Sequence, residues 1–307
     1  MSSVKYPLKL APVFKDAIWG GARLKRDFGA NTDLPRIAES WVLSDRASSE
    51  NIVLNGELAG YSLPDALREF GEPELPLLVK LIDAQEPLSV QVHPDDAFAQ
   101  SRNLPRGKTE MWYILDAVPN AHIYLGLSRA VTPDELRQRI ADGTIEDVLR
   151  RVPASRGNVF FIPAGTIHAL GGGILLAEVQ QSSDTTYRVY DYNRLGTDGA
   201  PRELHIDDAV ACANLTADVA KPFIIAEEGA FYGDFTAFRA TILNVTGRER
   251  VSVDATTFLS AIVVAGQCEL RCAGHTLDLA QGDSVYLASG LGAADFDGRC
   301  EVMLASV

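Results

Sequence analysis

Four side chains between residues 91 and 168 have the types and spacing of a metal site. Gln91 and His93 stand two positions apart in "SVQVHPDD", so they would point to the same face of a β-strand. Glu110 opens the apolar run "EMWYIL", and His168 follows the turn "PAGTI". Two imidazoles, one carboxylate and one amide oxygen suit Zn²⁺, and they would also fit Fe, Mn or Co. We therefore predict one divalent metal ion per chain, with Zn²⁺ as the first choice.

The elements that must position these residues are mostly short strands. Apolar or alternating runs such as "LLVKLIDA", "LSVQVH" and "FLSAIVVAG" are separated by Gly, Pro, Asn and Asp, a pattern typical of a β-sandwich or barrel. Helical signals are fewer, with Ser62 as one N-cap. In "TPDELRQRIADGTIEDVLRRV", Thr132 and Glu135 have capping-box spacing, and Pro133 takes the first helical position. We predict a helical pair here, inserted at about residues 128–152.

A weak internal repeat indicates that the chain contains two related units. Residues 157–168 read "GNVFFIPAGTIH", and residues 282–293 read "GDSVYLASGLGA" in the same frame. A strand, a tight turn and a second strand would produce both copies. Ala288 replaces the proline of the first copy, and Ala293 replaces its histidine. The first unit would therefore carry the reactive site, and the second unit would have a structural role.

The first copy resembles the motif of cupins, in which strands of a small jelly-roll barrel point alternate residues into the lumen. We expect a mainly β fold of two cupin-like jelly-roll barrels with a small helical insertion. A catalytic, metal-binding domain would span residues 1–215, and a degenerate copy without metal ligands would span residues 216–307. The junction would lie around "TADVAKPF", Thr216–Phe223.

Composition excludes several classes of function. The formal charge of −13, from 28 basic and 41 acidic residues, argues against binding to nucleic acid or to anionic membranes. No apolar run approaches the roughly 18 residues of a membrane helix. The N-terminus lacks an export signal, so we expect a cytoplasmic protein. The cysteines show no paired C-x-x-C motif, and we expect reduced thiols at Cys212, Cys268, Cys272 and Cys300.

Several of these stretches together resemble the type I mannose-6-phosphate isomerases, particularly the short bacterial form. The resemblance runs from about Pro7 to Val307 and rests on "IWGG", "LSVQVHPDD", "KTEMWYIL" and "PAGTIHALGGGILLAEVQQSSDTTYRVYDYNR". In order, the motifs are Q-x-H, K-x-E, P-x-G-x2-H and E-x5-D-x3-R. The resemblance implies zinc ligation by the four residues named above. It also implies a phosphorylated sugar as the partner, and we infer no protein partner. Longer relatives carry a tyrosine where this chain has Leu170.

The resemblance further implies interconversion of mannose 6-phosphate and fructose 6-phosphate through an enediol. A base must then move a proton between C2 and C1, and Glu178, Asp184 and Lys108 are candidates that we leave unranked. Arg188 would stabilise the enediolate or orient hydroxyl groups. The phosphate needs cations and hydroxyl donors, for which the candidates are Ser89, Lys80 and Arg194. Trp19 and Glu39 would lie close to the site in structural roles.

Two alternative functions share part of this pattern. A cupin dioxygenase or oxidase with redox-active iron would use the same ligands, but it would not require the E-x5-D-x3-R segment or a phosphate site. A non-catalytic, sugar-sensing cupin would bind a sugar phosphate without turnover. Metal analysis with oxygen uptake tests the first alternative, and an isomerase assay tests the second.

Overall fold

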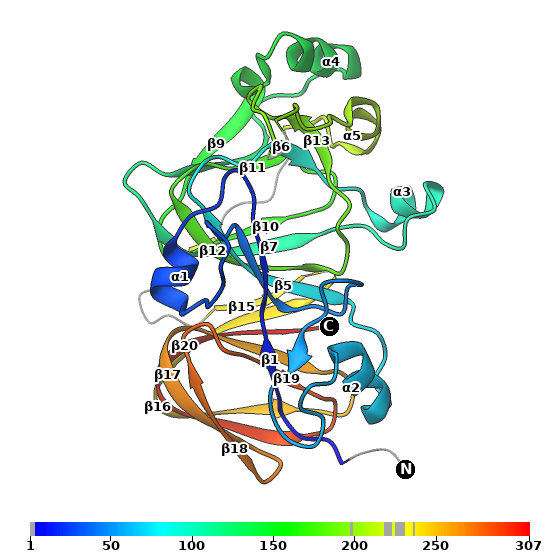
Figure 1. Ribbon diagram of the computed structural model, residues 1–307. Coiled ribbons are helices and arrows are strands. Elements are labelled where there is room, and N and C mark those ends of the chain that lie inside the picture. Colours follow the sequence, from blue (N-terminus) through cyan, green and yellow to red (C-terminus); the bar gives the residue numbers. More distant parts are fainter. Residues whose placement is uncertain (1–3, 197–198, 218–222, 225–230, 236) are drawn as a thin grey trace.

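Three antiparallel β-sheets, stacked in two lobes, make up most of the computed structural model (Figure 1). It describes residues 4–196, 199–217, 223–224, 231–235 and 237–307. The first lobe, in the upper half of Figure 1, contains a seven-stranded and a five-stranded sheet, and the second lobe contains an eight-stranded sheet. The expected mainly β fold is confirmed, although the sheets face each other without closing into continuous barrels.

The first lobe is a cupin-like pair of facing sheets. The seven-stranded sheet has the order β14-β10-β7-β12-β5-β3-β2. Its members are β2 (Val13–Lys15), β3 (Glu39–Leu43), β5 (Leu77–Ala84), β7 (Glu110–Ala117), β10 (Asn158–Ile162), β12 (Ile174–Gln181) and β14 (Phe223–Ile224). The five-stranded sheet has the order β13-β6-β11-β8-β9. Its members are β6 (Val90–Val92), β8 (His122–Leu127), β9 (Leu149–Pro153), β11 (His168–Leu170) and β13 (Tyr187–Tyr190).

The seven-stranded sheet is covered on both faces, which explains its nearly unbroken apolar strands. All eight residues of β5 are buried. One face packs toward the five-stranded sheet, where Trp112 and Ile82 share a core with Ile123. The other face packs on the second lobe, where Val79 shares a core with Ile262. A polar side chain on the inner face of this sheet is therefore held between two sheets and away from bulk water.

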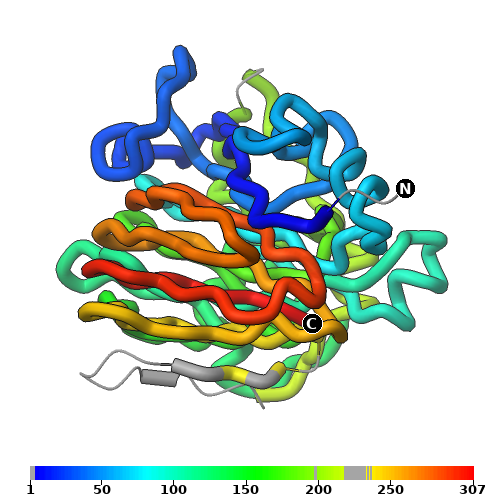
Figure 2. The backbone as a smooth tube through the Cα atoms, turned by 90° about the horizontal axis from the view of Figure 1, so that it is seen from below, coloured from blue at the N-terminus to red at the C-terminus, as the bar shows by residue number. Residues whose placement is uncertain are grey.

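The eight-stranded sheet combines strands from both ends of the chain. Its order is β15-β16-β20-β17-β19-β1-β4, and β18 pairs with β17. Figure 2 shows the long strands β16, β20 and β17 (yellow, red and orange) side by side. The members are β1 (Leu8–Ala11), β4 (Ile52–Val53), β15 (Phe231–Asp234), β16 (Arg239–Val253), β17 (Leu259–Cys272), β18 (His275–Ala280), β19 (Ser284–Leu287) and β20 (Gly292–Ser306).

The pairing of β1 with β19 means that the start of the chain crosses to the second lobe before it enters the first. A single boundary between residues 215 and 216 does not describe this crossing, and the division into two domains stays a proposal. Most of the predicted junction around Thr216–Phe223 lies outside the described residues.

The two copies of the internal repeat have matching backbone conformations. In the first, β10 leads through a turn into β11, and in the second, β19 leads through a turn into β20. Gly157 and Gly282 have φ angles of 85° and 97°, and Gly165 and Gly290 have φ angles of 81° and 79°. Left-handed conformations of this kind favour glycine, which explains why the spacing of glycines survives in the second copy. The predicted strand–turn–strand frame is confirmed in both copies.

Helices are short and lie outside the sheets (Figure 1). Ser62 Oγ accepts a hydrogen bond from Asp65 N, and Thr132 Oγ1 accepts one from Glu135 N, so both predicted N-caps are confirmed. Among the described residues, no helix has the length and apolar character that crossing a bilayer requires. The helices are α1 (Arg23–Phe28), α2 (Leu63–Phe70), α3 (Asp96–Ser101), α4 (Pro133–Ala141), α5 (Ile206–Cys212) and the 3₁₀ helix η1 (Ile145–Val148).

The predicted helical pair is corrected in its second half. Helix α4 is followed by Gly143, with a φ angle of 68°, and then by only one turn of 3₁₀ helix. Residues Leu149–Pro153, which were expected to complete a second helix, form β9 and pair with β8. Pairing at the edge of the five-stranded sheet outweighs the weak helical periodicity of this segment.

Candidate metal centre and active site

Three of the four predicted metal ligands meet in one buried cluster between the sheets. His93 follows β6, Glu110 begins β7 and His168 begins β11. One ligand atom from each lies within 4.8 Å of the others. Nε2 of His168 is 3.2 Å from one Glu110 oxygen, and Nε2 of His93 is 3.5 Å from the other. All three side chains are at most 1% exposed, so the cluster is a site built inside the lobe.

Both histidines are oriented by backbone carbonyl groups. Nδ1 of His93 donates to the Thr185 carbonyl oxygen at 2.9 Å, and Nδ1 of His168 donates to the Thr166 carbonyl oxygen at 2.9 Å. Since a carbonyl oxygen only accepts, each ring carries its hydrogen on Nδ1 and presents an unprotonated Nε2 to the cluster. Metal-binding histidines are commonly fixed in this way.

The charges of the cluster also prepare it for a cation. Lys108 Nζ is 2.9 Å from Glu110 Oε2 and 3.1 Å from His93 Nε2. Although burial opposes ionisation, Lys108 and the two histidines hold the pKa of Glu110 well below its usual range. Burial, and then the charge of Lys108, lower the pKa of His93 well below its usual value. An ionised carboxylate and neutral imidazoles are the protonation states that metal binding requires.

Several ligand atoms lack hydrogen-bond partners, which is the observation that a metal ion would explain. Both carboxylate oxygens of Glu110 and Nε2 of His168 are buried and have no hydrogen-bond partner of acceptable geometry among the described residues. Buried polar atoms are normally satisfied. The donor set of two imidazole nitrogens and a carboxylate fits Zn²⁺ and leaves positions for an amide oxygen, water or substrate.

Gln91, the fourth predicted ligand, lies beside the cluster. Its Cα is paired with that of His168 on β11 and with that of Arg188 on β13. Directly paired residues of neighbouring strands point to the same face of a sheet. Gln91, His168 and Arg188 therefore form one row across the inner face of the five-stranded sheet. This register places the predicted catalytic arginine next to the predicted amide ligand.

A second buried group lies on the inner face of the opposite sheet. Glu178 on β12 is paired with Lys80 on β5 and with Trp112 on β7. Lys80 Nζ is 3.5 Å from Glu178 Oε1 and 3.4 Å from Glu39 Oε2, and it lies 5.2 Å from the centre of the Trp41 ring. Lys80, Glu178 and Glu110 thus come from one sheet, and Lys108, two residues before β7, is buried with them.

The pKa values of the two carboxyl groups in this second group are shifted in opposite directions. Burial, and then the nearby Glu110, raise the pKa of Glu178. Although burial opposes ionisation, Lys80 holds the pKa of Glu39 below its usual range. Glu178 Oε2 accepts a hydrogen bond from Trp112 Nε1 at 3.0 Å, while its buried Oε1 has no hydrogen-bond partner among the described residues. Glu178 therefore combines a raised pKa with an oxygen that forms an ion pair with Lys80 but makes no hydrogen bond among the described residues, which suits it to proton transfer.

The three remaining predicted residues have other surroundings. Asp184 is exposed and forms an ion pair with Arg46 at 2.8 Å, so the structure does not bring it into the buried groups. Arg194 Nη2 lies 2.6 Å from an Asp191 oxygen, and its Nη1 donates to the Pro87 carbonyl oxygen at 2.5 Å. Ser89 is buried just before β6, two residues from Gln91.

Sequence reasoning missed residues that support the site. The Trp112 ring contacts that of His168 edge-on, with centroids 5.4 Å apart, and its position two residues after Glu110 was a signal for a shared strand face. Trp41 Nε1 donates to Glu39 Oε2 at 2.6 Å, and only the motif "AESW" pointed to this contact. Trp19, expected close to the site, lies in the core between the sheets.

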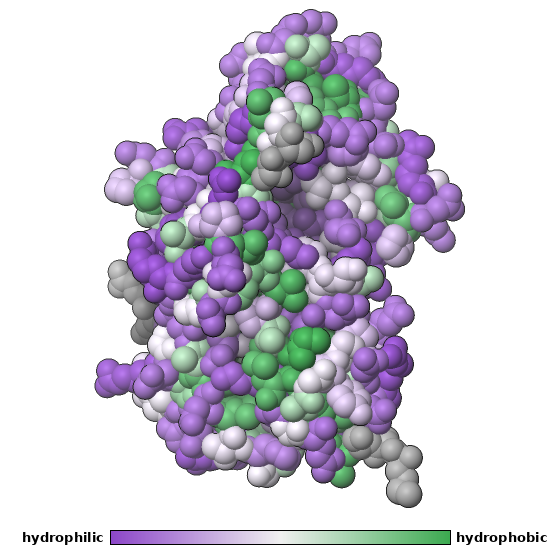
Figure 3. Space-filling model, in the orientation of Figure 1, coloured by the Kyte–Doolittle hydropathy of each residue, from purple (hydrophilic) through white to green (hydrophobic). Residues whose placement is uncertain are grey.

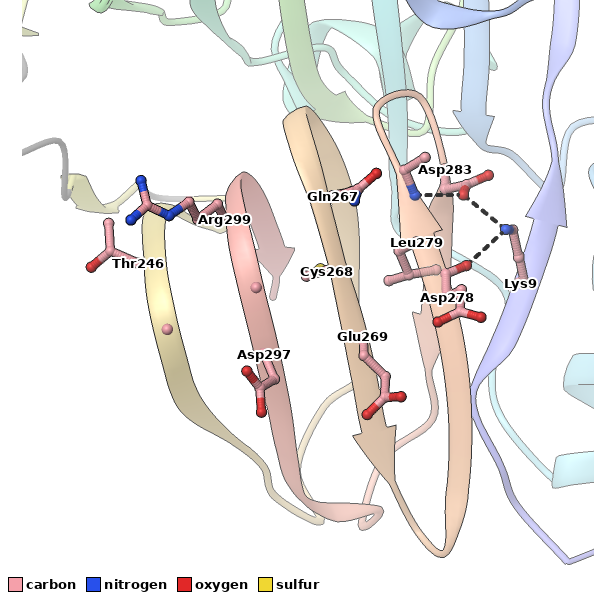
Figure 4. Close-up of a pocket in the computed structure, with 13 residues that line it drawn as sticks. Lys9, Thr246, Gln267, Cys268, Glu269, Asp278, Leu279, Asp283, Asp297 and Arg299 are labelled. Carbon is pink, nitrogen blue, oxygen red and sulfur yellow. Dashed lines mark hydrogen bonds and ion pairs between the residues drawn. The ribbon is translucent and has the colours of Figure 1, made fainter.

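The surface of the first lobe is hollowed on the side shown in Figure 3. The space-filling view shows a depression with mostly hydrophilic walls between α1 and α3, at the level where Figure 1 shows the space between the two sheets (Figure 3). A groove of about 1010 Å³ lies across the eight-stranded sheet of the second lobe (Figure 4). Its described lining includes Lys9, Glu269 and Asp278 but no histidine. No second cluster of three metal-ligating side chains occurs in the part of the chain that the structure describes.

The free cysteines lie apart from the cluster. Cys268, Cys272 and Cys300 belong to the core of the second lobe, and Cys212 lies at the end of α5. Burial raises the pKa of Cys212 to about 12, which makes its thiolate a minor species at neutral pH. The candidate metal centre of the first lobe therefore offers nitrogen and oxygen ligands only among the described residues.

Two facing sheets that enclose two histidines and a glutamate define a protein of the cupin class with a candidate metal centre in its first lobe. The family model for the phosphomannose isomerase type I catalytic domain matches residues 8–119, and the model for the mannose-6-phosphate isomerase cupin domain matches residues 230–307. The probable mannose-6-phosphate isomerase GmuF of Bacillus subtilis (strain 168) is 37% identical, over 97% of this chain and 98% of the relative. The chain therefore belongs to the type I phosphomannose isomerase family.

Other relatives agree with this assignment. The mannose-6-phosphate isomerase of Streptococcus mutans is 34% identical, with 97% of each chain covered. The crystal structure of the mannose 6-phosphate isomerase from Bacillus subtilis superposes with a TM-score of 0.89 at 34% identity, covering 98% of this chain and 99% of that one. A putative mannosephosphate isomerase from Archaeoglobus fulgidus, at 20% identity and a TM-score of 0.79, shares the fold.

Proposed function

We propose that this protein interconverts mannose 6-phosphate and fructose 6-phosphate through an enediol, at a divalent metal centre between the two sheets of the first lobe. The buried cluster of His93, Glu110 and His168, with ligand atoms that make no hydrogen bonds among the described residues, is the observation that carries the proposal. Family membership supports the choice of substrate, since the similar proteins bear the name mannose-6-phosphate isomerase.

His93 Nε2, His168 Nε2, a Glu110 oxygen and the Gln91 amide oxygen would hold the metal, which we take to be Zn²⁺. When bound, such an ion supplies Lewis acidity that stabilises negative charge on the sugar oxygens. Because Glu110 is the one charged residue in this ligand set, the centre keeps a net positive charge, which favours an enediolate. A site with several thiolate ligands would lose this advantage.

Glu178 and Lys108 are the groups that we assign to proton transfer. Glu178 Oε1 has no hydrogen-bond partner among the described residues, and burial raises the pKa of this carboxyl group. Lys108 Nζ lies within 3.1 Å of the His93 ligand atom. A proton carrier at either position would lie close to a sugar held at the centre. The exposed position of Asp184 gives it no comparable support.

Arg188 and three further residues would bind the charged parts of the substrate. Arg188 lies next to Gln91, and its buried Nε has no hydrogen-bond partner among the described residues. We propose that this guanidinium stabilises the enediolate. For the phosphate we keep Ser89, Lys80 and Arg194, of which Lys80 already lies between two carboxylates.

A coupled assay tests the proposal directly. Fructose 6-phosphate formed from mannose 6-phosphate is converted to glucose 6-phosphate and then oxidised, and NADPH is measured at 340 nm. We expect turnover that is lost after removal of the metal and restored by Zn²⁺. Sugar phosphate binding without turnover would refute the isomerase and favour a sensor. Oxygen uptake by an iron-loaded protein would favour the oxidase alternative.

The cytoplasmic location of the protein stays a prediction.

A further inference from the structure

One fully buried polar side chain beside the metal centre has no role in the proposed reaction. Gln180 lies near the end of β12 and is 0% exposed. Its Cα is paired with that of Glu110 on β7, so both side chains point to the inner face of the sheet. A buried amide is costly unless its groups are hydrogen-bonded. The hydrogen bonds that Gln180 makes therefore indicate what it does.

The amide of Gln180 holds the loop that follows its own strand. Its Nε2 donates to the Gln181 carbonyl oxygen at 2.9 Å and to the Ser183 carbonyl oxygen at 2.6 Å. Because both partners only accept, the NH₂ group must face them, and the amide orientation is fixed. This leaves Oε1 without a hydrogen-bond partner among the described residues. The side chain thus clamps the start of the loop of residues 182–186, between β12 and β13.

The same loop supplies the carbonyl group that orients one metal ligand. Thr185, two residues after Ser183, accepts the hydrogen bond from His93 Nδ1 at 2.9 Å. The amide N–H of Thr185 also contacts Ser183 Oγ at 3.4 Å. The position of the Ser183 backbone therefore influences where the Thr185 carbonyl lies. Loss of that carbonyl would let His93 place its hydrogen on Nε2, where it would block metal binding.

His168 provides an internal comparison. Its orienting carbonyl belongs to Thr166, in the turn before β11. That turn is held by backbone bonds, from Thr166 N to the Pro163 carbonyl oxygen at 3.1 Å and from Gly165 N to the His93 carbonyl oxygen at 2.7 Å. Gln180 donates to the Gln181 and Ser183 carbonyl groups and not to a group of this turn. A change at Gln180 should therefore affect His93 and leave His168 in place.

We propose that Gln180 is a positioning residue of the metal centre: by holding the Ser183 carbonyl, it keeps the Thr185 carbonyl on His93 Nδ1 and leaves His93 Nε2 free as a ligand. The predicted effect on zinc affinity rests on the metal centre of the proposed function. The tautomer of His93 in the metal-free protein is independent of any reaction.

The test compares Gln180→Met with the wild type and with Gln138→Met, a control on the exposed face of α4. Methionine has a similar length but no N–H to donate. Long-range ¹H–¹⁵N spectra of the metal-free proteins report the tautomer of each of the five histidines. We expect His93 to lose its uniform Nδ1–H form in Gln180→Met while His168 keeps its own. Zinc affinity, measured by chelator competition, should fall at least tenfold, as is usual for loss of a group that orients a ligand.

Gln180→Leu provides a second variant if Gln180→Met does not fold. Its side chain has no hydrogen to donate to the two carbonyl groups, so it should show the same loss. An unchanged His93 tautomer together with unchanged zinc affinity in a folded variant would overturn the inference. A wild-type protein that binds no zinc would instead overturn the proposed metal centre, and the spectra would still test the clamp.

Discussion

Lys108 contacts two of the proposed metal ligands, His93 and Glu110. Replacing this lysine should strengthen metal binding and abolish turnover. Its Nζ lies 3.1 Å from His93 Nε2 and 2.9 Å from a Glu110 oxygen. An ion bound to His93 at an ordinary zinc–nitrogen distance of about 2.1 Å would lie within about 5 Å of Nζ. With one ligand carboxylate, the centre has a net charge of about +1. Two unit charges 5 Å apart repel by about 3 kcal/mol at an effective dielectric constant of about 20.

Removing this repulsion in Lys108→Met should tighten zinc binding by up to about a hundredfold, and by at least about tenfold if the wild-type lysine can turn away. Chelator competition measures the affinity, and the coupled assay measures turnover. Lys9→Met, in the second lobe, controls for the loss of one positive charge at a distance. Unchanged or weaker zinc binding in a folded Lys108→Met variant would show that the Lys108 charge does not repel an ion bound to His93 and Glu110.

Three further predictions concern other parts of the structure. Arg188→Ala should keep its metal by elemental analysis and lose most of kcat, whereas loss of folding would mean a structural role. Burial and the neighbouring carboxylate raise the pKa of Glu178, so the folded protein retains a proton that the unfolded chain releases above the ordinary pKa of 4.5. In urea titrations of the metal-free proteins, wild type should therefore lose stability relative to Glu178→Gln as pH rises through this window, and a constant difference would contradict the shift. Gly266→Ala should lower the free energy of unfolding by more than Gly274→Ala does. Both glycines have a φ of 76°, a left-handed conformation that costs a non-glycine residue about 1–3 kcal/mol, but only at Gly266 would the new Cβ lie 2.2 Å from a carbonyl oxygen. Equal losses in urea titrations would exclude the close contact as the cause.

Residue spacing predicted those parts of the site that lie within one strand or directly beside its end. The two-residue steps from Gln91 to His93 and from Lys108 to Glu110 placed each pair on one side of the lumen, and the structure brings Lys108, Glu110 and His93 into contact. The glycine spacing of the repeat predicted two matching turns because left-handed φ angles demand that residue. These features depend on local geometry, which a sequence specifies directly.

Other features depend on distant segments and had no local signal. The carbonyl groups of Thr185 and Thr166 orient the histidines, but every residue has a carbonyl group, so the sequence does not single them out. Asp184 matched a family motif, yet the path of its loop turns the side chain toward Arg46. The pairing of β1 with the second lobe joins residues more than 270 positions apart, and no periodicity encodes such a contact.

The pairing of Lys80 with Glu39 and Glu178 is another contact between separate strands. A lysine inside an apolar run can either point into the lumen or extend its charged end to the surface, and the structure buries Lys80 among carboxylates. Its two carboxylate partners come from β3 and β12. Although burial opposes the charge, these partners raise the pKa of Lys80, so the lysine is a permanent cation in the site. Only the order of strands in the sheet shows which carboxylates reach it.

The central claim is that Gln91, His93, Glu110 and His168 hold one divalent ion on which isomerisation depends. Anomalous diffraction at the zinc absorption edge, from crystals of zinc-loaded and catalytically active protein, tests it most directly. We predict one peak per chain, about 2.0–2.2 Å from Nε2 of both histidines and from an oxygen of Glu110. A peak at other residues, or an active crystal form with no anomalous peak at these ligands, would contradict the account.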